Sequence, residues 1–229
     1  LAAAASTEKG IFAPDETQTQ DFLKAWEDYT SNAAHKIVKF VPASGAASRM
    51  FKNMFAFADA PYDTPTTDFE KHFFDSIHHA AFYADLDAAC HKLHERGIDT
   101  LMNEGQYKDV VRAMLGKEGL NYGALPKGLL KFHKYAEGAR TPLEEHLVEG
   151  ALYAREKDGT VNVHFTVSPE HRDLFEALVK KVVPAYEEKF GVKYCVTFSE
   201  QKPNTDTMTI RPSARRMVLC YSARAATAH

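Results

Sequence analysis

Lys39-Phe-Val-Pro-Ala-Ser-Gly-Ala-Ala-Ser-Arg-Met-Phe-Lys52 is the stretch of sequence that decides the fold. Ile37 to Val41 is a short apolar run with one lysine, which is typical of a buried strand. Pro42 to Ala47 consists of small turn residues, and apolar residues recur at helical spacing from Ser48 onward. The stretch therefore predicts a strand, a tight loop and a helix in direct succession.

The loop of small residues is a candidate phosphate site. A loop between a strand and a helix presents backbone N–H groups, and the start of the helix adds partial positive charge. Ser48 is placed to cap this helix, and Arg49 supplies a cation that suits phosphate. The predicted substrate-binding residues here are Ser44, Gly45, Ala46, Ala47 and Ser48. On this stretch alone, an ordinary loop without a ligand is the alternative.

Two later stretches carry a family resemblance, Leu125-Pro-Lys-Gly-Leu-Leu-Lys-Phe132 and Thr141-Pro-Leu-Glu-Glu-His-Leu147. With the loop, they resemble the signature of nucleotide-sugar pyrophosphorylases and related nucleotidyltransferases. That signature reads small-x-Gly-x-Gly-Ser/Thr-Arg-Met, then Pro-Lys-x-Leu-Leu, then Pro-Leu-x-x-His. The chain departs from it at Ala47, where a second glycine is usual. It also places Arg49 and Lys127 far apart, where the family has a short loop.

A third motif, Phe198-Ser-Glu-Gln-Lys-Pro-Asn-Thr-Asp-Thr207, directly follows a predicted strand. It resembles the family's Gln-x-x-Pro-x-Gly-Thr-Ala segment, with Asn204 at the usual glycine. The resemblance implies that Gln201 and Thr205 contact a base or sugar. An amide and hydroxyl groups at the carboxyl end of a strand suit such hydrogen bonds. A polar turn with no ligand is the alternative.

The composition bounds the protein class. At 229 residues the chain has room for one α/β domain with a helical insertion. A net charge of −3 gives no general attraction to nucleic acid or to an anionic membrane. The three cysteines have no C-x-x-C spacing, which favours a reducing compartment such as the cytoplasm. No apolar run approaches the ~20 residues of a membrane span.

The remaining patterns complete a β–α–insertion–α–β–α–β order. They predict helices at 17–29, at 68–115 (two or three helices), at 141–156 and at 169–190, and strands at 161–167 and 193–198. This order predicts a doubly wound, mostly parallel sheet. We expect an N-terminal helical segment at 1–36, a partial nucleotidyltransferase-like domain at 37–207 with a helical insertion at about 61–122, and an atypical tail at 208–229.

The insertion is rich in histidine and lies in sequence between the loop and the Pro-Lys motif. That position predicts a lid or rim beside the site. Cys90 and His94 stand four residues apart, which puts two potential metal ligands on one helix face. A helical metal protein built on His78, His91 and His94 is one alternative function. A partly solvated helical insertion without metal is the other interpretation of these residues.

The resemblance is closer still to one uncharacterised bacterial family, domain of unknown function 4301. It covers about Gly10 to Thr207 and implies a nucleotide-diphospho-sugar-transferase-like fold. By the wider resemblance, Arg49 and Lys127 are the catalytic cations and Mg²⁺ is the cofactor. The metal-binding aspartate of the related enzymes follows a later strand and has no counterpart here; Asp206 is the nearest carboxylate. We therefore expect a fragment with weak or no activity.

The tail does not fit the rest of the chain. Arg211 to His229 contains four arginines, no acidic residue and no periodicity. One hypothesis is that the residues after about Thr207 are out of frame. The reason is that a shifted reading of freely back-translated codons gives an acidic, glycine-rich continuation that looks like the family's own. A basic nucleic-acid-binding tail is the alternative.

Two functions follow as expectations. The first is a nucleotidyltransferase-like protein that binds a nucleotide or nucleotide-sugar and transfers a nucleotidyl group to a sugar phosphate. The second is a non-catalytic module that binds a nucleotide or phosphosugar. Neither involves a nucleic acid or a membrane as partner, and the oligomeric state, the nucleotide and the sugar are left open.

Overall fold

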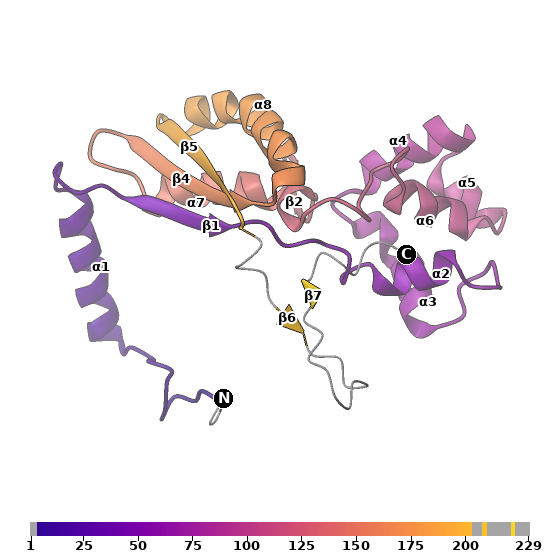
Figure 1. The fold of residues 1–229 in the computed structure, drawn as a ribbon, viewed down its shortest axis with the longest axis horizontal. Coiled ribbons are helices and arrows are strands. Elements are labelled where there is room, and N and C mark those ends of the chain that lie inside the picture. Colours follow the sequence, from indigo (N-terminus) through magenta and orange to yellow (C-terminus); the bar gives the residue numbers. More distant parts are fainter. Residues whose placement is uncertain (1–3, 203–207, 210–220, 223–229) are drawn as a thin grey trace.

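The computed structural model describes residues 4–202, 208–209 and 221–222. Figure 1 shows two groups of elements joined by a narrow connection, an α/β unit and a helical unit. Each unit has its own cluster of buried apolar side chains. We call residues 51–122 the helical unit. The α/β unit comprises the parallel strands β1, β4 and β5 with helices α7 and α8.

The sheet of the α/β unit is parallel, in the order β1-β4-β5. Its strands are β1 (Val38–Pro42), β4 (Thr160–Val167) and β5 (Lys193–Glu200). Helix α7 (Pro142–Tyr153) leads into β4, and α8 (Arg172–Phe190) connects β4 to β5. An α/β fold with parallel strands is therefore confirmed.

Helices α7 and α8 pack against each other and against one face of this sheet. That face carries Val163 and Phe165, which are fully buried with Leu147 of α7 and Phe175 of α8. On the opposite face, the Phe40 side chain is 62% exposed. A doubly wound sheet has helices on both faces; the described helices that pack on this sheet cover one.

Local signals in the sequence set the ends of α7 and α8. Thr141 forms a capping box with Glu144, and Pro142 occupies the first turn of α7. Gly150 lets α7 approach the sheet, because a Cβ atom there would lie 2.8 Å from Val161 Cγ1. Gly191 ends α8 with a φ of 60°, a left-handed conformation that favours glycine.

The helical unit contains more helices between residues 68 and 115 than the two or three that the sequence predicts. They are α3 (Asp68–Ser76), α4 (Tyr83–His94), α5 (Ile98–Asn103) and α6 (Tyr107–Leu115), with a 3₁₀ turn at Ile77–His79, and α2 (Lys52–Ala58) precedes them. Left-handed Glu95 ends α4, and Gly105, with a φ of 76°, lies between α5 and α6. These two positions divide one long apolar pattern into short helices.

A buried carboxylate orders the segment that enters α3. Glu70 Oε2 accepts hydrogen bonds from the backbone N–H groups of Thr66 and Thr67, at 2.8 and 3.0 Å. Glu70 Oε1 accepts a third from the Tyr62 hydroxyl at 3.0 Å. Burial raises the pKa of Glu70, but these hydrogen bonds outweigh it and hold the pKa below its usual value.

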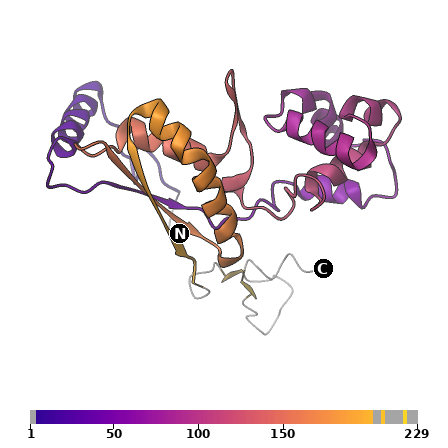
Figure 2. The ribbon, with the colours of Figure 1, turned by 90° about the horizontal axis from the view of Figure 1, so that it is seen from above.

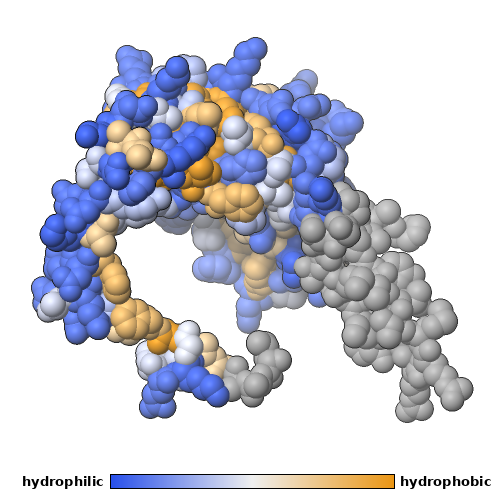
Figure 3. Space-filling model, turned by 60° about the vertical axis from the view of Figure 1, so that its left-hand side comes forward, coloured by the Kyte–Doolittle hydropathy of each residue, from blue (hydrophilic) through white to orange (hydrophobic). Residues whose placement is uncertain are grey.

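Helix α1 (Glu16–Thr30) forms an arm that no described side chain buries. Asp15 and Gln18 form its capping box. The arm is attached where the Trp26 indole N–H donates a hydrogen bond to the Tyr153 carbonyl oxygen at 2.9 Å. Figure 3 shows apolar side chains along the inner side of this arm, toward the hollow between it and the rest of the molecule. The exposed apolar residues of the helix are Phe22, Leu23, Trp26 and Tyr29.

A short antiparallel hairpin, β2 (His133–Tyr135) and β3 (Gly138–Arg140), precedes α7. In Figure 2 it stands out from the molecule between the two units. Beyond β5, the backbones of β6 (Met208–Thr209) and β7 (Tyr221–Ser222) pair antiparallel. In the part of the chain that the structure describes, no helix is long and apolar enough to cross a membrane.

Candidate functional site at the carboxyl edge of the sheet

The carboxyl ends of β1, β4 and β5 meet at one edge of the sheet, as parallel strands require. The chain leaving β1 stays paired with β4 for one more residue, since the Ala43 N–H donates to the Thr166 carbonyl oxygen at 2.7 Å. Likewise, the Gln201 N–H donates to the Val167 carbonyl oxygen at 2.9 Å. The Ser44 hydroxyl then donates to Gln201 Oε1. The first and third sequence motifs are thus in side-chain contact.

The Pro-Lys motif reaches the same loop through backbone pairing. The Lys127 N–H donates to the Gly45 carbonyl oxygen at 3.1 Å. Ala46 and Pro126 form an isolated antiparallel bridge. The loop and Lys127 are far apart in the sequence but adjacent in the structure, because the chain enters and leaves the helical unit at this point. The structure brings all three motifs together.

Close packing of Gly128 against the Phe175 ring holds the backbone at Lys127 in place. Lys127, Gly128 and Leu129 form a 3₁₀ turn that packs on α7. A Cβ atom at Gly128 would lie 2.9 Å from two carbons of the Phe175 ring. Phe175 is fully buried, so its ring has little freedom to yield. Glycine at 128 therefore lets the Pro-Lys segment seat against the core of the α/β unit.

The loop offers hydrogen-bond donors for a ligand. Gly45 and Ala46 are exposed, whereas Ala47 is fully buried in the core of the helical unit. Within the described residues, no acceptor takes the amide hydrogens of Ser44, Gly45 or Ser48. Unpaired backbone N–H groups in a turn suit an anion. The Ala47 side chain itself is part of the core and is turned away from any ligand.

The expected helix start at Ser48 is wrong. The chain first makes a turn, in which the Met50 N–H bonds to the Ala47 carbonyl oxygen at 2.8 Å. Helix α2 begins only at Lys52, its N-cap is Phe51, and no side chain caps it. The physical reason is that bridging of Ala46 to Pro126 and burial of Ala47 fix the backbone before helical geometry can start. Ser48 is therefore a turn residue and not a cap.

Two cations lie on this edge without a described partner. Arg49 and Lys127 are both exposed, and neither side chain forms an ion pair or hydrogen bond within the described residues. The neighbouring Arg172 differs, since it contacts Glu176 at 2.8 Å and Glu200 at 3.1 Å. Arg49 and Lys127 remain available to an anionic ligand. An unpaired cation beside free amides is the usual chemistry of a phosphate site.

A polar link that the sequence does not predict joins the end of β4 to the Pro-Lys segment. Buried Ser168 contacts His171 Nδ1 at 2.8 Å through its hydroxyl oxygen. His171 Nε2 lies 3.2 Å from the Ala124 carbonyl oxygen. The only signal was the spacing of Ser168 and His171 around a proline, which is common at helix starts. This link holds the start of α8 beside the segment that carries Lys127.

A further polar cluster lies on the open face of the sheet. His164 of β4 contacts the hydroxyls of Thr197 and Ser199 at 2.8 and 2.9 Å. Its ring stacks on Phe40 with centroids 5.2 Å apart. The cluster extends from the Gln201 end of β5 along the sheet. Its hydroxyl and imidazole groups already bond one another, so it supports the sheet surface next to the site.

The described residues do not form a metal site. No group of three or more His, Cys, Asp or Glu side chains among them is arranged to hold an ion. Cys90 is fully buried, and burial raises the pKa of its thiol to about 11, which disfavours the thiolate that binds metal. At the sheet edge, the Glu200 carboxylate is bound by Arg172. The Mg²⁺ expected from the resemblance stays a prediction, because Thr205 and Asp206 lie outside the described residues.

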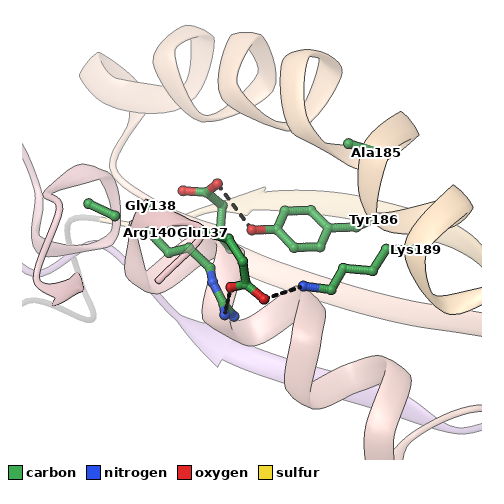
Figure 4. Close-up of a pocket in the computed structure, with 8 residues that line it drawn as sticks. Glu137, Gly138, Arg140, Ala185, Tyr186 and Lys189 are labelled. Carbon is green, nitrogen blue, oxygen red and sulfur yellow. Dashed lines mark hydrogen bonds and ion pairs between the residues drawn. The ribbon is translucent and has the colours of Figure 1, made fainter. Parts of the chain in front are cut away.

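A shallow hollow of about 240 Å³ lies elsewhere, between the hairpin and α8. Figure 4 shows its charged groups contacting one another. Glu137 contacts Arg140 at 3.7 Å and Lys189 at 3.5 Å, and the Tyr186 hydroxyl donates to Glu144 at 3.2 Å. None of the sequence-predicted site residues lines it. Since its charges are internally paired, the edge of the sheet is the stronger candidate site.

The comparisons with known proteins give a family and no activity. No curated protein and no solved structure matches the chain. The family described as Domain of unknown function (DUF4301) matches residues 1–218. The resemblance to that family, drawn from the loop, the Pro-Lys motif and the Gln201 motif, is thereby confirmed. The chain belongs to the DUF4301 family.

Proposed function

We propose that the protein binds a nucleotide or a nucleotide-sugar at the carboxyl edge of the parallel sheet. In this proposal the sheet is part of a doubly wound, nucleotide-diphospho-sugar-transferase-like domain. One observation carries it. Three motifs that are far apart in the sequence meet at the loop, through the Gly45–Lys127 hydrogen bond and the Ser44–Gln201 contact. Ligands of open parallel α/β sheets bind at this edge.

The phosphates would occupy the loop. The amides of Ser44, Gly45 and Ser48, which have no acceptor among the described residues, supply donors, and Arg49 and Lys127 supply charge. Charge-assisted hydrogen bonds to phosphate are worth roughly 1.5–3 kcal/mol each. Both cations are already solvated and exposed, so binding requires no buried pair to break. The loop is thus prepared for a di- or triphosphate.

The base or sugar would lie toward Gln201. The Ser44 hydroxyl donates to Gln201 Oε1 and thereby orients the side-chain amide. An oriented amide distinguishes donor and acceptor patterns on a base or a sugar hydroxyl. This assignment puts the phosphate end on the Lys127 side of the loop and the base end on the β5 side.

Nucleotidyl transfer is the reaction that this arrangement would support. The phosphate oxygen of a sugar phosphate attacks the α-phosphorus, a new P–O bond forms, and the bond to pyrophosphate breaks. Arg49 and Lys127 would stabilise the negative charge of the transition state, and no protein nucleophile is required. The alternative is a module that binds the ligand without turnover. It is favoured because the carboxylate at the end of β5, Glu200, is already paired with Arg172.

Calorimetry with a panel of nucleoside triphosphates and nucleotide-sugars tests the proposal. We expect saturable binding of at least one ligand at one site per chain. A pyrophosphate-release assay with sugar phosphates and Mg²⁺ then separates the two functions, since binding without turnover supports the module. Absence of binding by a chain whose circular dichroism shows a folded protein would refute the proposal.

A further inference from the structure

The two units share almost no apolar contact. The apolar core of the helical unit is formed by α2 to α6 and that of the α/β unit by β1, β4, β5, α7 and α8. No helix of the first unit packs extensively on the sheet, α7 or α8 within the described residues. Figure 2 shows the two groups standing apart, joined by two crossing segments. We call these segments, residues 43–50 and 123–132, the neck.

The neck packs on the helical unit through Leu130, which is fully buried in that core, and through the Lys131 N–H, which donates to the Tyr122 hydroxyl at 3.1 Å. The ion pair and the hydrogen bond that reach the helical unit from the side chains of Lys131 and Lys134 are polar and exposed. Lys131 Nζ of the neck contacts Asp85 of α4 at 2.6 Å, and both side chains are more than one-third exposed. Lys134 Nζ of the hairpin donates to the His78 carbonyl oxygen at 3.4 Å. Exposed ion pairs stabilise an interface little, because water screens the charges. Such contacts orient the units but do not lock them.

The space between the units is not filled. A hollow of about 270 Å³ lies between α4 and the hairpin, lined by Ala80, Tyr83, Lys134 and Tyr135 among others. Interiors of single units are close-packed, so an open space at a junction marks surfaces that are not pressed together. Within a chain, a small polar interface is where relative motion is expected.

The neck is also the candidate ligand loop. Its one described β-bridge joins Ala46 to Pro126, and Gly45 accepts the hydrogen bond from Lys127. Ala47 lies in the core of the helical unit, whereas Leu129 packs on the core of the α/β unit. A ligand that binds Gly45 and Lys127 therefore contacts both segments of the neck.

We infer that the helical unit is a lid that turns as a rigid body about the neck, and that a phosphate-bearing ligand on the neck sets its position. The inference rests on the proposed function for the identity of its ligand. A ligand that contacts both neck segments favours the orientations in which they are close, and it shifts the population toward them. Lid closure would then exclude water from the phosphates.

Distances between spin labels test the lid. Lys92 of α4 and Lys181 of α8 are exposed and have no described partner, so Lys92→Cys with Lys181→Cys places one label on each unit. Cys195 and Cys220 are replaced by serine, while buried Cys90 is kept. The matched controls are Lys92→Cys with Lys71→Cys, within the helical unit, and Lys157→Cys with Lys181→Cys, within the α/β unit.

We expect a distance distribution for the cross-unit pair that is several-fold broader than for either control pair in the free protein. Saturation with inorganic pyrophosphate, or with a nucleotide that binds by calorimetry, should narrow and shift it while leaving the controls unchanged. A free-protein distribution as narrow as the controls would overturn the lid. Calorimetric binding without a shift would overturn the coupling to ligand. Absence of binding would refute the proposed function and the coupling to ligand. The width of the cross-unit distance distribution in the free protein would still test whether the helical unit moves.

Discussion

The backbone N–H of Lys127 donates a hydrogen bond to the carbonyl oxygen of Gly45 at 3.1 Å. This bond joins the end of β1 to a segment that the chain reaches only after the whole helical unit. It explains how the Gly45 loop and the Pro-Lys motif can be neighbours although the helical unit separates them in the sequence. The insertion starts and ends at one place, so the site residues are not separated in space.

Gly128→Ala should weaken both stability and ligand binding. The added methyl group would lie 2.9 Å from the buried Phe175 ring, so either the ring or the Lys127 turn must shift. Overpacking of this kind costs about 1–3 kcal/mol in the free energy of unfolding. Urea unfolding measures it, with Gly45→Ala as the matched control because nothing lies within 4 Å of a Cβ there. Equal stability of the two variants would contradict the packing argument.

The Ser44–Gln201 contact should appear as a coupling energy. Ser44→Ala and Gln201→Ala each remove one partner of a half-buried hydrogen bond between the β1 and β5 ends. Such a bond contributes about 0.5–1.5 kcal/mol, so the double variant should lose less stability than the sum of the singles. Urea unfolding of the four proteins measures the coupling. Strict additivity would mean that the two motifs do not interact in solution.

Glu70→Gln should lower stability at neutral pH and make stability fall less steeply as the pH decreases. The folded-state pKa of Glu70 is lowered, so its stabilisation is present above the usual pKa near 4.5. It is lost as the pH falls through the lower folded-state value. The substitution removes charge from a carboxylate bonded by Thr66, Thr67 and Tyr62, at a cost of about 1–3 kcal/mol.

Thermal unfolding between pH 3 and 7 checks this, with exposed Glu118→Gln as the control. The wild-type protein and the control should lose stability more steeply than Glu70→Gln below pH 4.5. Parallel curves for all three proteins would show that the Glu70 carboxylate is not a net stabiliser.

The described cysteines should differ strongly in reactivity. Cys195 is exposed on β5, whereas Cys90 is buried and the pKa of its thiol is raised to about 11. At pH 8 that pKa alone leaves about one thiolate per thousand Cys90 thiols. In a Cys220→Ser protein, one equivalent of Ellman's reagent should react within minutes and the second only with unfolding. Two fast equivalents would show that the core of the helical unit opens readily.

Patterns of period and capping predict the parallel strands and the helices of the α/β unit, whereas the doubly wound arrangement is not confirmed. The strand at 161–167 and the helix after Thr141 are present almost as predicted, because alternation and the Thr141–Glu144 capping box are local signals. The motifs also predict that Ser44, Lys127 and Gln201 contribute to one site, since a family resemblance implies a shared three-dimensional arrangement. Their roles in binding and catalysis remain predictions.

Other features could not be predicted from the sequence because they depend on contacts between distant residues. Ser48 looked like a cap, yet pairing of Ala46 with Pro126 displaces the helix start to Lys52. The four helices between residues 68 and 115 share one continuous apolar pattern, and backbone conformations such as that of Glu95 divide it. No periodicity reveals that the core of the helical unit is separate from that of the sheet.

The most direct measurement is calorimetry of nucleotide binding by the wild-type chain and by the Arg49→Ala/Lys127→Ala variant. The matched control is Lys71→Ala/Lys92→Ala, which removes two exposed cations of the helical unit. With charge-assisted contacts worth roughly 1.5–3 kcal/mol each, the site variant should bind at least a hundredfold more weakly while the control is unchanged. Equal affinity of the site variant and the wild-type chain would contradict a phosphate site at the Gly45 loop.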